Sequence, residues 1–247
     1  MVDIVSVLSG SVDGRNYWKV LKNRLNEEGN ESVTKCNQLK MKSSDGKYYL
    51  TDVADLEATF RIIQSIPSPK AEPFKLWLAQ VGKERIDEIK DPELAVNRAK
   101  AIYEKKGYPK DWVDKRMRGI AIRNTLTDTW QERGAKGGND FAILTNEIYK
   151  GTFDLTAKEY KDHKDLHPES NLRDHMDDVE LILTMLGEAT TNRISEVKDS
   201  KGMPELQTDA KIGGKIAGNT RKEIEKETKK RVVTKNNFLP QQKPHLK

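Results

Sequence analysis

Apolar residues recur every three or four positions on both sides of a proline-rich corner at residues 67–73. This spacing places them on one face of an amphipathic helix. Pro67 and Pro69 cannot continue the first helix, whereas Pro73 suits the first turn of a second one. We therefore expect two helices held at a rigid corner over one small core. Their apolar stripes consist of Val53, Leu56, Phe60 and Ile63 before the corner and Phe74, Trp77, Leu78 and Val81 after it.

The segment before this corner has the pattern of a β-hairpin. Leu39 and Met41 alternate with lysines in an expected strand at residues 33–41. Asp45-Gly46 is a dipeptide typical of tight hairpin turns, and Tyr48 begins the return strand. Two short helices, at about residues 1–10 and 15–27, are expected before the hairpin.

The rest of the chain predicts helices separated by turn signals. Asp91-Pro92-Glu93 combines an N-cap acceptor, a proline at the first helical position and an acid near the positive end of the helix dipole. Thr156 and Glu159 have the spacing of a capping box. Asn171 is expected to cap a long helix with one apolar stripe, formed by Leu172, Met176, Val179, Ile182, Leu183 and Leu186. The expected longer helices cover about residues 92–107, 110–133, 139–150, 171–200 and 205–230. After the last of them, the apolar pairs Val232-Val233 and Phe238-Leu239 are expected to dock back on the helices.

The composition favours a soluble, helix-rich protein with modest apolar cores. Aromatic residues make up 6% and charged residues 34% of the 247 positions. The single cysteine, Cys36, excludes an internal disulfide and a cysteine zinc site. No signal-peptide pattern opens the chain, and no apolar run approaches the roughly 18 residues of a transmembrane helix. We therefore expect a cytoplasmic protein without a membrane partner.

The net charge of +5 is unevenly distributed. Residues 1–110 carry 19 Lys/Arg and 16 Asp/Glu, residues 111–210 carry 14 and 20, and residues 211–247 carry 11 and 3. The middle of the chain is therefore acidic and its last segment strongly basic. A basic end segment favours a phosphate-binding arm; the alternative is a solvated helix face followed by a disordered tail.

The corner sequence RIIQSIPSPKAEPFKLWLAQVG (61–82) closely resembles the Bro-N family, the N-terminal domain of phage antirepressors, baculovirus repeated-ORF proteins and relatives of DNA-damage-inducible protein D. Bro-N domains usually begin with a β-hairpin before their first helix, whereas Met1 stands about where that helix starts. A nucleic-acid contact made by that hairpin therefore cannot be carried over. The resemblance continues through YWKVLKNRL (17–25), VTKCNQLKM (33–41), KGYPKDWVDKRMRGIAIR (106–123), LTDTWQERGAKGG (126–138), FAILTNEIYKGTF (141–153), NLRDHMDDVELI (171–182) and GGKIAGNTRKEIE (213–225).

Together these observations predict an α+β, predominantly helical protein. We expect a Bro-N-like domain with a β-hairpin at residues 1–92 and connecting helices at 93–135. A helical C-terminal domain should occupy 136–239, before a disordered tail at 240–247.

The expected hairpin is the first candidate nucleic-acid site. A basic two-stranded ribbon can enter a DNA groove, where lysines contact phosphates and Asn or Gln contacts base edges. The alternative is an exposed edge hairpin whose lysines prevent strand pairing between molecules. The candidate residues are Lys35, Asn37, Lys40, Lys42 and Lys47, extended by Lys19 and Lys22 on the preceding helix.

The last helix and the residues after it form the second candidate. Gly213, Gly214 and Gly218 permit close backbone approach by a nucleic acid or by another helix, and their apolar neighbours favour helix packing. Gly213 and Gly218 also have the separation of a P-loop, but Asn219 stands where that motif requires lysine. The candidate phosphate-binding cations are Arg221, Lys222, Lys229, Lys230 and Arg231.

Histidines offer the one metal-site candidate. His163 and His167 are four residues apart and could share a metal on a helix, but Pro168 would end that helix immediately. Lys164 also stands where a metalloprotease motif needs glutamate. We therefore expect no metal, cofactor or catalytic residue. Cys36 is expected to act as a small hydrophobe. The four tryptophans lie on apolar helical faces and are expected to be core residues or contacts between helices: Trp18, Trp77, Trp112 and Trp130.

The expected function is a non-enzymatic regulator that binds duplex DNA, as the antirepressor-like resemblance implies. A homodimer through residues 94–133 and 171–200 would double its DNA contacts. A second hypothesis is a protein-interaction regulator whose acidic residues 111–210 contact a repressor or a recombinase. A third is a metal-dependent nuclease using His163 and His167.

Overall fold

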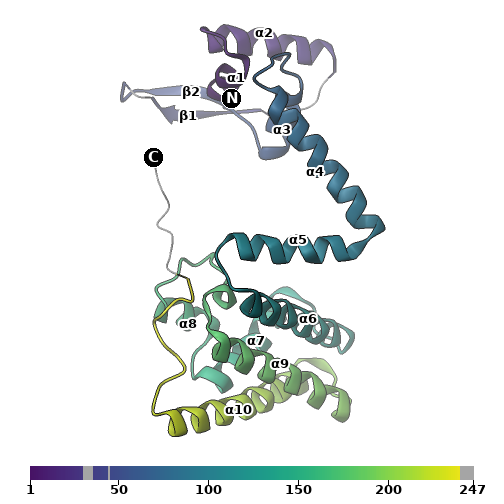
Figure 1. The fold of residues 1–247 in the computed structure, drawn as a ribbon, viewed down its shortest axis with the longest axis vertical. Helices are drawn as coiled ribbons and strands as arrows, with labels where there is room; N and C mark the ends of the chain where they lie inside the picture. The colour runs from purple at the N-terminus through teal and green to yellow at the C-terminus, as the bar shows by residue number, and fades with distance from the viewer. Residues whose placement is uncertain (30–35, 44, 240–247) are drawn as a thin grey trace. The chain divides into compact units, whose positions relative to one another are not determined.

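The computed structural model describes residues 1–29, 36–43 and 45–239. The chain divides into two compact units, unit 1 at Met1–Ala95 and unit 2 at Val96–Lys247. The fold is α+β and predominantly helical, as predicted, with one two-stranded antiparallel sheet in the described ranges (Figure 1). The expected domain boundaries after residues 92 and 135 rest on turn signals and stay a prediction. Lys35 and the expected tail at 240–247 lie outside the described residues.

Unit 1 is a small core of helices that carries a β-ribbon. Asp13 and Asp55 cap α2 (Gly14–Glu27) and α3 (Leu56–Gln64), because each side chain accepts a hydrogen bond from a backbone N–H three residues later. The apolar faces of these helices close over Val5, Trp18, Leu25 and Ile62. The elements are α1 (Val2–Ser9), α2 (Gly14–Glu27), β1 (Asn37–Lys42), β2 (Tyr48–Val53), α3 (Leu56–Gln64) and α4 (Glu72–Lys90).

The proline corner forms where the sequence predicts it, but the core beneath its second helix is smaller. Phe74 and Trp77 pack around Phe60, with ring centroids 5.4 and 6.2 Å from it. Trp77 is therefore a contact between two helices, one of the two roles expected of it, although it stays 48% exposed. Val81 is exposed as well, so the apolar stripe after the corner is not buried along its whole length. The nine-residue α3 can cover only part of the nineteen-residue α4. Leu56 is also exposed, because it opens α3 at its outer end.

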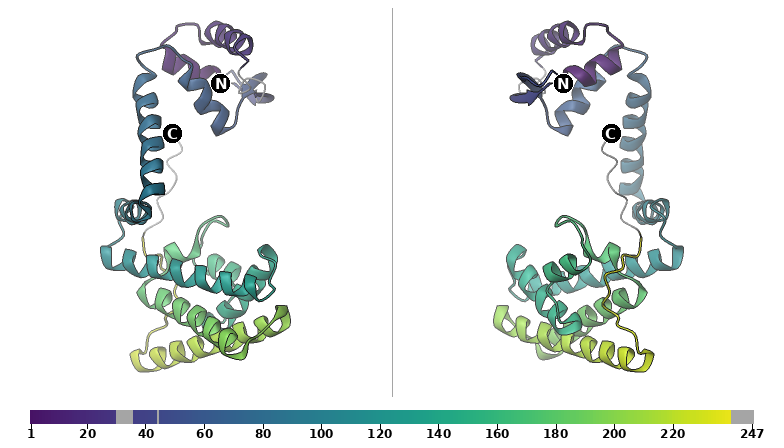
Figure 2. Two further views of the ribbon diagram at one scale, coloured as in Figure 1. Left: turned by 90° about the vertical axis from the view of Figure 1, so that its right-hand side faces the viewer. Right: turned by 90° about the vertical axis from the view of Figure 1, so that its left-hand side faces the viewer.

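Unit 2 is a helical bundle. α10 (Gly202–Thr228) packs against α7 (Gly138–Phe153) and α9 (Asp178–Lys198), and α6 (Lys110–Glu132) packs against α9, as the two views of Figure 2 show. The capping box of Thr156 and Glu159 is present at the start of α8, as predicted. α5 (Pro92–Lys105) crosses the boundary between the units, and unit 2 continues with α6 (Lys110–Glu132), α7 (Gly138–Phe153), α8 (Ala157–His163), the 3-10 helix η1 (Leu172–His175), α9 (Asp178–Lys198) and α10 (Gly202–Thr228).

The helix expected to run from Asn171 is interrupted. Asn171 caps the short η1, and Met176 is extended, with φ −85° and ψ 143°. α9 then begins with its own cap, Asp177. Because the interruption changes the helical register, Val179 and Ile182 point outward instead of continuing the predicted buried stripe.

Glycines let the helices of unit 2 approach closely. A Cβ atom on Gly218 would lie 2.0 Å from the carbonyl oxygen of Gly151, and one on Gly213 would lie 2.1 Å from Thr191 Oγ1. The predicted close approach therefore brings helix against helix. Gly213 and Gly218 lie inside a continuous helix, which a phosphate-binding loop does not allow.

The segment after α10 docks back on unit 2, as predicted. Val232 is buried, and the Phe238 ring stacks on Trp112 and Tyr108 with centroids 5.2 and 5.8 Å apart. Trp112 lies in the core as predicted, and so do Trp18 and Trp130. The docked segment thus completes an aromatic cluster of unit 2.

A fully buried ion pair holds this segment. Lys164 Nζ lies 3.0 Å from Glu180 Oε1 and donates to the backbone oxygen of Asn236 at 2.7 Å. Tyr160 donates its hydroxyl hydrogen to Glu180 as well. Burial raises the pKa of Glu180, although the hydrogen bond from Tyr160 and the charge of Lys164 oppose this shift. Lys164 is therefore a structural cation with its donors satisfied.

Candidate nucleic-acid interface

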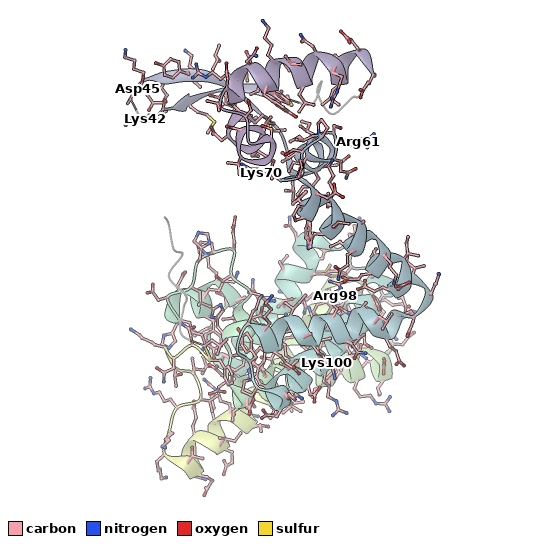
Figure 3. The ribbon with its side chains drawn as sticks, turned by 45° about the horizontal axis from the view of Figure 1, so that its top comes forward. Lys42, Asp45, Arg61, Lys70, Arg98 and Lys100 are labelled. Carbon is pink, nitrogen blue, oxygen red and sulfur yellow. The ribbon has the colours of Figure 1, made fainter. Side chains whose placement is uncertain are left out.

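The predicted hairpin is a two-stranded ribbon whose lysines are exposed. β1 and β2 pair antiparallel, with Lys40 opposite Leu50 and Lys42 opposite Tyr48. Residues directly opposite each other share one face of a sheet, so these four side chains form one face of the ribbon. Figure 3 shows Lys42 and Asp45 at the outer end of this ribbon. These two strands and Lys47, residues 37–42 and 47–53, form the basic ribbon.

The turn of the ribbon is fixed by short-range hydrogen bonds. The Gly46 backbone N–H donates to the Ser43 carbonyl oxygen, and Gly46 adopts φ +81°, a conformation that favours glycine. Asp45 accepts hydrogen bonds from the Lys47 backbone N–H at 3.0 Å and from the Tyr49 hydroxyl at 2.8 Å. These bonds lower the pKa of Asp45. The turn thus keeps one negative charge beside the lysines.

The base of the ribbon is tied to α2 through Asp52. Its carboxylate accepts hydrogen bonds from Trp18 Nε1 at 2.7 Å, Lys22 Nζ at 2.9 Å and Gln38 Nε2 at 3.0 Å. Partial burial opposes its ionisation, but these hydrogen bonds prevail and lower the pKa of Asp52 to about 2. The Met1 amino group also donates to the Asp52 backbone oxygen. The ribbon is therefore held at one end and projects at the other.

The structure separates the predicted ribbon residues into two groups. Lys22 is bound to Asp52 and so anchors the ribbon. The side chains of Asn37, Lys40, Lys42, Lys47 and Lys19 are exposed. None of these four lysines forms an ion pair with another described residue.

Sequence reasoning missed the exposed apolar side chains of the ribbon. Tyr48 and Leu50 lie beside the lysines, while Leu39 and Met41 lie on the opposite face, and all four are exposed. A hairpin that only prevented aggregation would not need apolar side chains on both faces. Strand alternation did predict that Leu39 and Met41 share a face, but it could not show that this face stays uncovered.

A groove lies between the ribbon and the helices. It has a volume of about 480 Å³ and is lined by side chains of both, including Arg15, Trp18, Lys42 and Tyr49. Arg15 is exposed at the start of α2 and was missed because one arginine in a helix carries no signal by itself. The groove therefore brings the Arg15 cation and the Trp18 and Tyr49 rings close to Lys42.

The cations predicted near the C-terminus also divide into two groups. Arg221 is buried, pairs with Asp154 and donates to the backbone oxygen of Phe153, so it is not available to a phosphate. This pairing was not predictable because the two partners lie 67 positions apart in sequence. Lys222, Lys229, Lys230 and Arg231 are exposed at the end of α10.

The histidines do not share a helix. α8 ends at His163, so His167 lies beyond it and is exposed. Burial lowers the pKa of His175. The described residues contain no group of three or more His, Cys, Asp or Glu placed to hold a metal ion.

Cys36 packs partly buried against the core of unit 1, as predicted for a small hydrophobe, and burial raises the pKa of its thiol.

The fold and this site define a helix-rich α+β protein with an exposed basic ribbon in one unit and a closed helical bundle in the other. The family model of the DinD C-terminal domain matches residues 115–245. This match covers more than half of the chain, and the chain belongs to that family, the C-terminal region of DNA-damage-inducible protein D. Among curated proteins none matches this sequence. The match does not include the corner at residues 61–82, where the resemblance to Bro-N begins, so the assignment of residues 1–92 to a Bro-N-like domain stays a prediction. None of the described helices combines the length and apolar composition that crossing a bilayer requires.

Proposed function

We propose that this protein is a non-enzymatic regulator that binds duplex DNA through the basic ribbon. The observation that carries the proposal is the set of exposed lysines Lys40, Lys42 and Lys47 on a ribbon that projects from its anchor. These lysines form no ion pair with another described residue, so they can neutralise phosphates at no cost in broken ion pairs. Membership of the DinD C-terminal domain family supports a role in the response to DNA damage.

The ribbon also supplies groups that reach beyond phosphates. A two-stranded ribbon fits the major groove, which is about 12 Å wide. Asn37 is exposed and can contact a base edge, whereas Gln38 is bound to Asp52. Tyr48 and Leu50 give apolar contact area beside the lysines. We therefore propose phosphate contacts by lysines and base contacts by Asn37.

The alternative function, protein binding through the acidic residues 111–210, has less support. Many carboxylates of this region already pair with cations of the same chain, so a basic partner would have to compete with those ion pairs. The paired carboxylates include Asp111, Asp114, Asp154, Asp174, Asp178, Glu180, Glu188, Glu196, Asp199 and Asp209.

A homodimer remains part of the proposal. Val179 and Ile182 are exposed on α9, within the residues expected to form the dimer surface. A two-fold partner would place two ribbons on one duplex. Exposed apolar side chains on this helix support self-association, and sedimentation of the purified chain tests it.

Charge reversal on the ribbon tests the proposed function. Lys40→Glu with Lys42→Glu should abolish binding of the full chain to a labelled duplex, because both substitutions place negative charge against phosphate. The matched control is Lys105→Glu with Lys110→Glu, which makes the same charge change at exposed positions of unit 2. Equal binding by the two double variants would refute the proposal.

A further inference from the structure

Unit 2 contains a cleft whose lining includes none of the residues proposed to bind DNA. It lies between the first half of α7 and α8, with Arg123 of α6 at its side, and it has a volume of about 620 Å³. Clefts of about 300–1,000 Å³ are typical of sites for small molecules. Every lining residue belongs to unit 2, so the cleft does not depend on the basic ribbon.

Arg123 presents a fixed guanidinium to this cleft. Its Nη2 donates to Thr145 Oγ1 at 2.6 Å, and its guanidinium lies over the Trp130 ring, 5.2 Å from the centroid. Its Nη1 lies 3.4 Å from Glu188 Oε1. A guanidinium has five N–H donors, so these contacts leave donors for a ligand.

The charge behind Arg123 is not balanced. Glu188 is almost completely buried, and it is shared by Arg123 and Arg173, whose Nη2 lies 2.6 Å from the same oxygen. Two guanidiniums therefore face one carboxylate in a poorly solvated region, which leaves a net positive charge. Burial lowers the pKa of Arg123; the charge of Glu188 opposes this shift, and the charge of Arg173 adds to it. An anion in the cleft would balance it.

The walls of the cleft add both charge and apolar surface. Lys158 and Lys161 contribute two more cations, against one carboxylate, Asp162. The apolar part of the lining comes from the Phe141 ring and the small side chains of Ala142 and Ala157. Three cations against one acid favour a dianionic phosphate over a single carboxylate. The aromatic ring and the small residues leave room for a flat apolar body.

We propose that this cleft binds a nucleoside monophosphate, either free or as the phosphorylated end of a DNA strand. The phosphate contacts Arg123 and Lys158, and the base lies against Phe141. Bidentate binding by an arginine is a common way to hold a phosphate.

Titration calorimetry of the full chain with dAMP tests the proposal, with deoxyadenosine and inorganic phosphate as comparisons. We expect dAMP to bind more tightly than either fragment, because only dAMP uses both the cations and the apolar wall. Equal affinity for phosphate and dAMP would overturn the proposal. So would tighter binding of the peptide Ala-Ala-Phe, whose carboxylate is the competing chemistry, or no binding of any nucleotide up to about 1 mM.

Substitutions locate the binding. Lys158→Glu reverses a cation of the cleft, and Ala142→Phe fills it from an exposed position on α7. Each should weaken dAMP binding on the order of tenfold, about 1.4 kcal/mol. Lys150→Glu is the matched control, since Lys150 is exposed on α7 but does not line the cleft, and it should leave binding unchanged. Thermal unfolding verifies that all three variants fold. Unchanged binding in both folded cleft variants would overturn the assignment.

A second set of titrations distinguishes the two sources of the phosphate. The chain carrying Lys40→Glu and Lys42→Glu removes the contribution of the ribbon. In this background, a single strand with a 5′-phosphate is compared with the same strand ending in a hydroxyl. Binding of the phosphorylated strand that is tighter than that of both dAMP and the hydroxyl-ended strand assigns the site to DNA ends. Tighter binding of dAMP than of either strand assigns it to free nucleotides. Because the ribbon is disabled, the result is independent of the proposed function.

Discussion

The glycines of α10 give the prediction that the structure determines most directly. A Cβ atom on Gly218 would lie 2.0 Å from the carbonyl oxygen of Gly151 and 3.1 Å from its carbonyl carbon, so Gly218→Ala forces two helix backbones apart. Overpacking of this kind costs about 1–3 kcal/mol, and more when a backbone must move. Gly119→Ala in α6 is the matched control, since its Cβ would meet the flexible Met185 side chain at 3.5 Å, an ordinary contact distance.

The two variants should move stability in opposite directions. Alanine is better than glycine inside a helix by about 1 kcal/mol, so Gly119→Ala should be neutral or stabilising. Gly218→Ala receives the same gain but loses more through the clash. Each kcal/mol shifts Tm by about 2–4 °C in a domain of this size, so differential scanning calorimetry should place Gly218→Ala several degrees below Gly119→Ala. Equal melting temperatures would refute helix packing as the role of Gly218 and favour an exposed role in nucleic-acid binding.

Three further predictions concern buried and anchoring groups. Lys164→Met should lower the free energy of unfolding in urea by about 3–5 kcal/mol, because it leaves the buried Glu180 carboxylate without its cation. Adding Glu180→Leu should recover much of that loss. A double variant less stable than the single variant would contradict this account. Partial burial opposes ionisation of Asp52, but hydrogen bonds lower its pKa to about 2, below the about 3.9 of an unfolded chain. Its stabilising effect is therefore present above about pH 4 and is lost as the pH falls toward 2. Asp52→Asn should remove this part of the acid sensitivity, as measured by circular dichroism. An acid-unfolding profile that Asp52→Asn leaves unaltered would be inconsistent with the anchor. Phe238→Ala should destabilise unit 2 by up to about 3 kcal/mol through lost stacking on Trp112, and an unchanged Tm would show that the docked segment is not part of the core.

Local signals in the sequence predicted most elements of the fold. The capping box at Thr156, the proline corner and the Asp45-Gly46 turn each depend on residues a few positions apart, so the sequence contains the whole interaction. The break at Met176 was missed because Asn171 and Asp177 are competing caps in one apolar run. Which cap begins the long helix depends on tertiary packing.

Long-range contacts account for what sequence reasoning could not reach. The exposed lysines of the ribbon were named from composition and turn chemistry alone. Nothing local indicated that Lys22 would bind Asp52, 30 positions away, or that Arg221 would be buried. The cleft beside Arg123 was missed for the same reason, because α6, α7 and α8 form it together.

The salt dependence of DNA binding tests the central claim most directly. Each phosphate that a lysine neutralises adds about −0.9 to the slope of log K against log salt, so removing one such contact makes the slope shallower by about 0.9. Lys40→Gln with Lys42→Gln should therefore reduce the slope by about 2, while Lys105→Gln with Lys110→Gln should leave it unchanged. A full-chain slope near zero, or the same slope in both double variants, would contradict DNA binding by the basic ribbon.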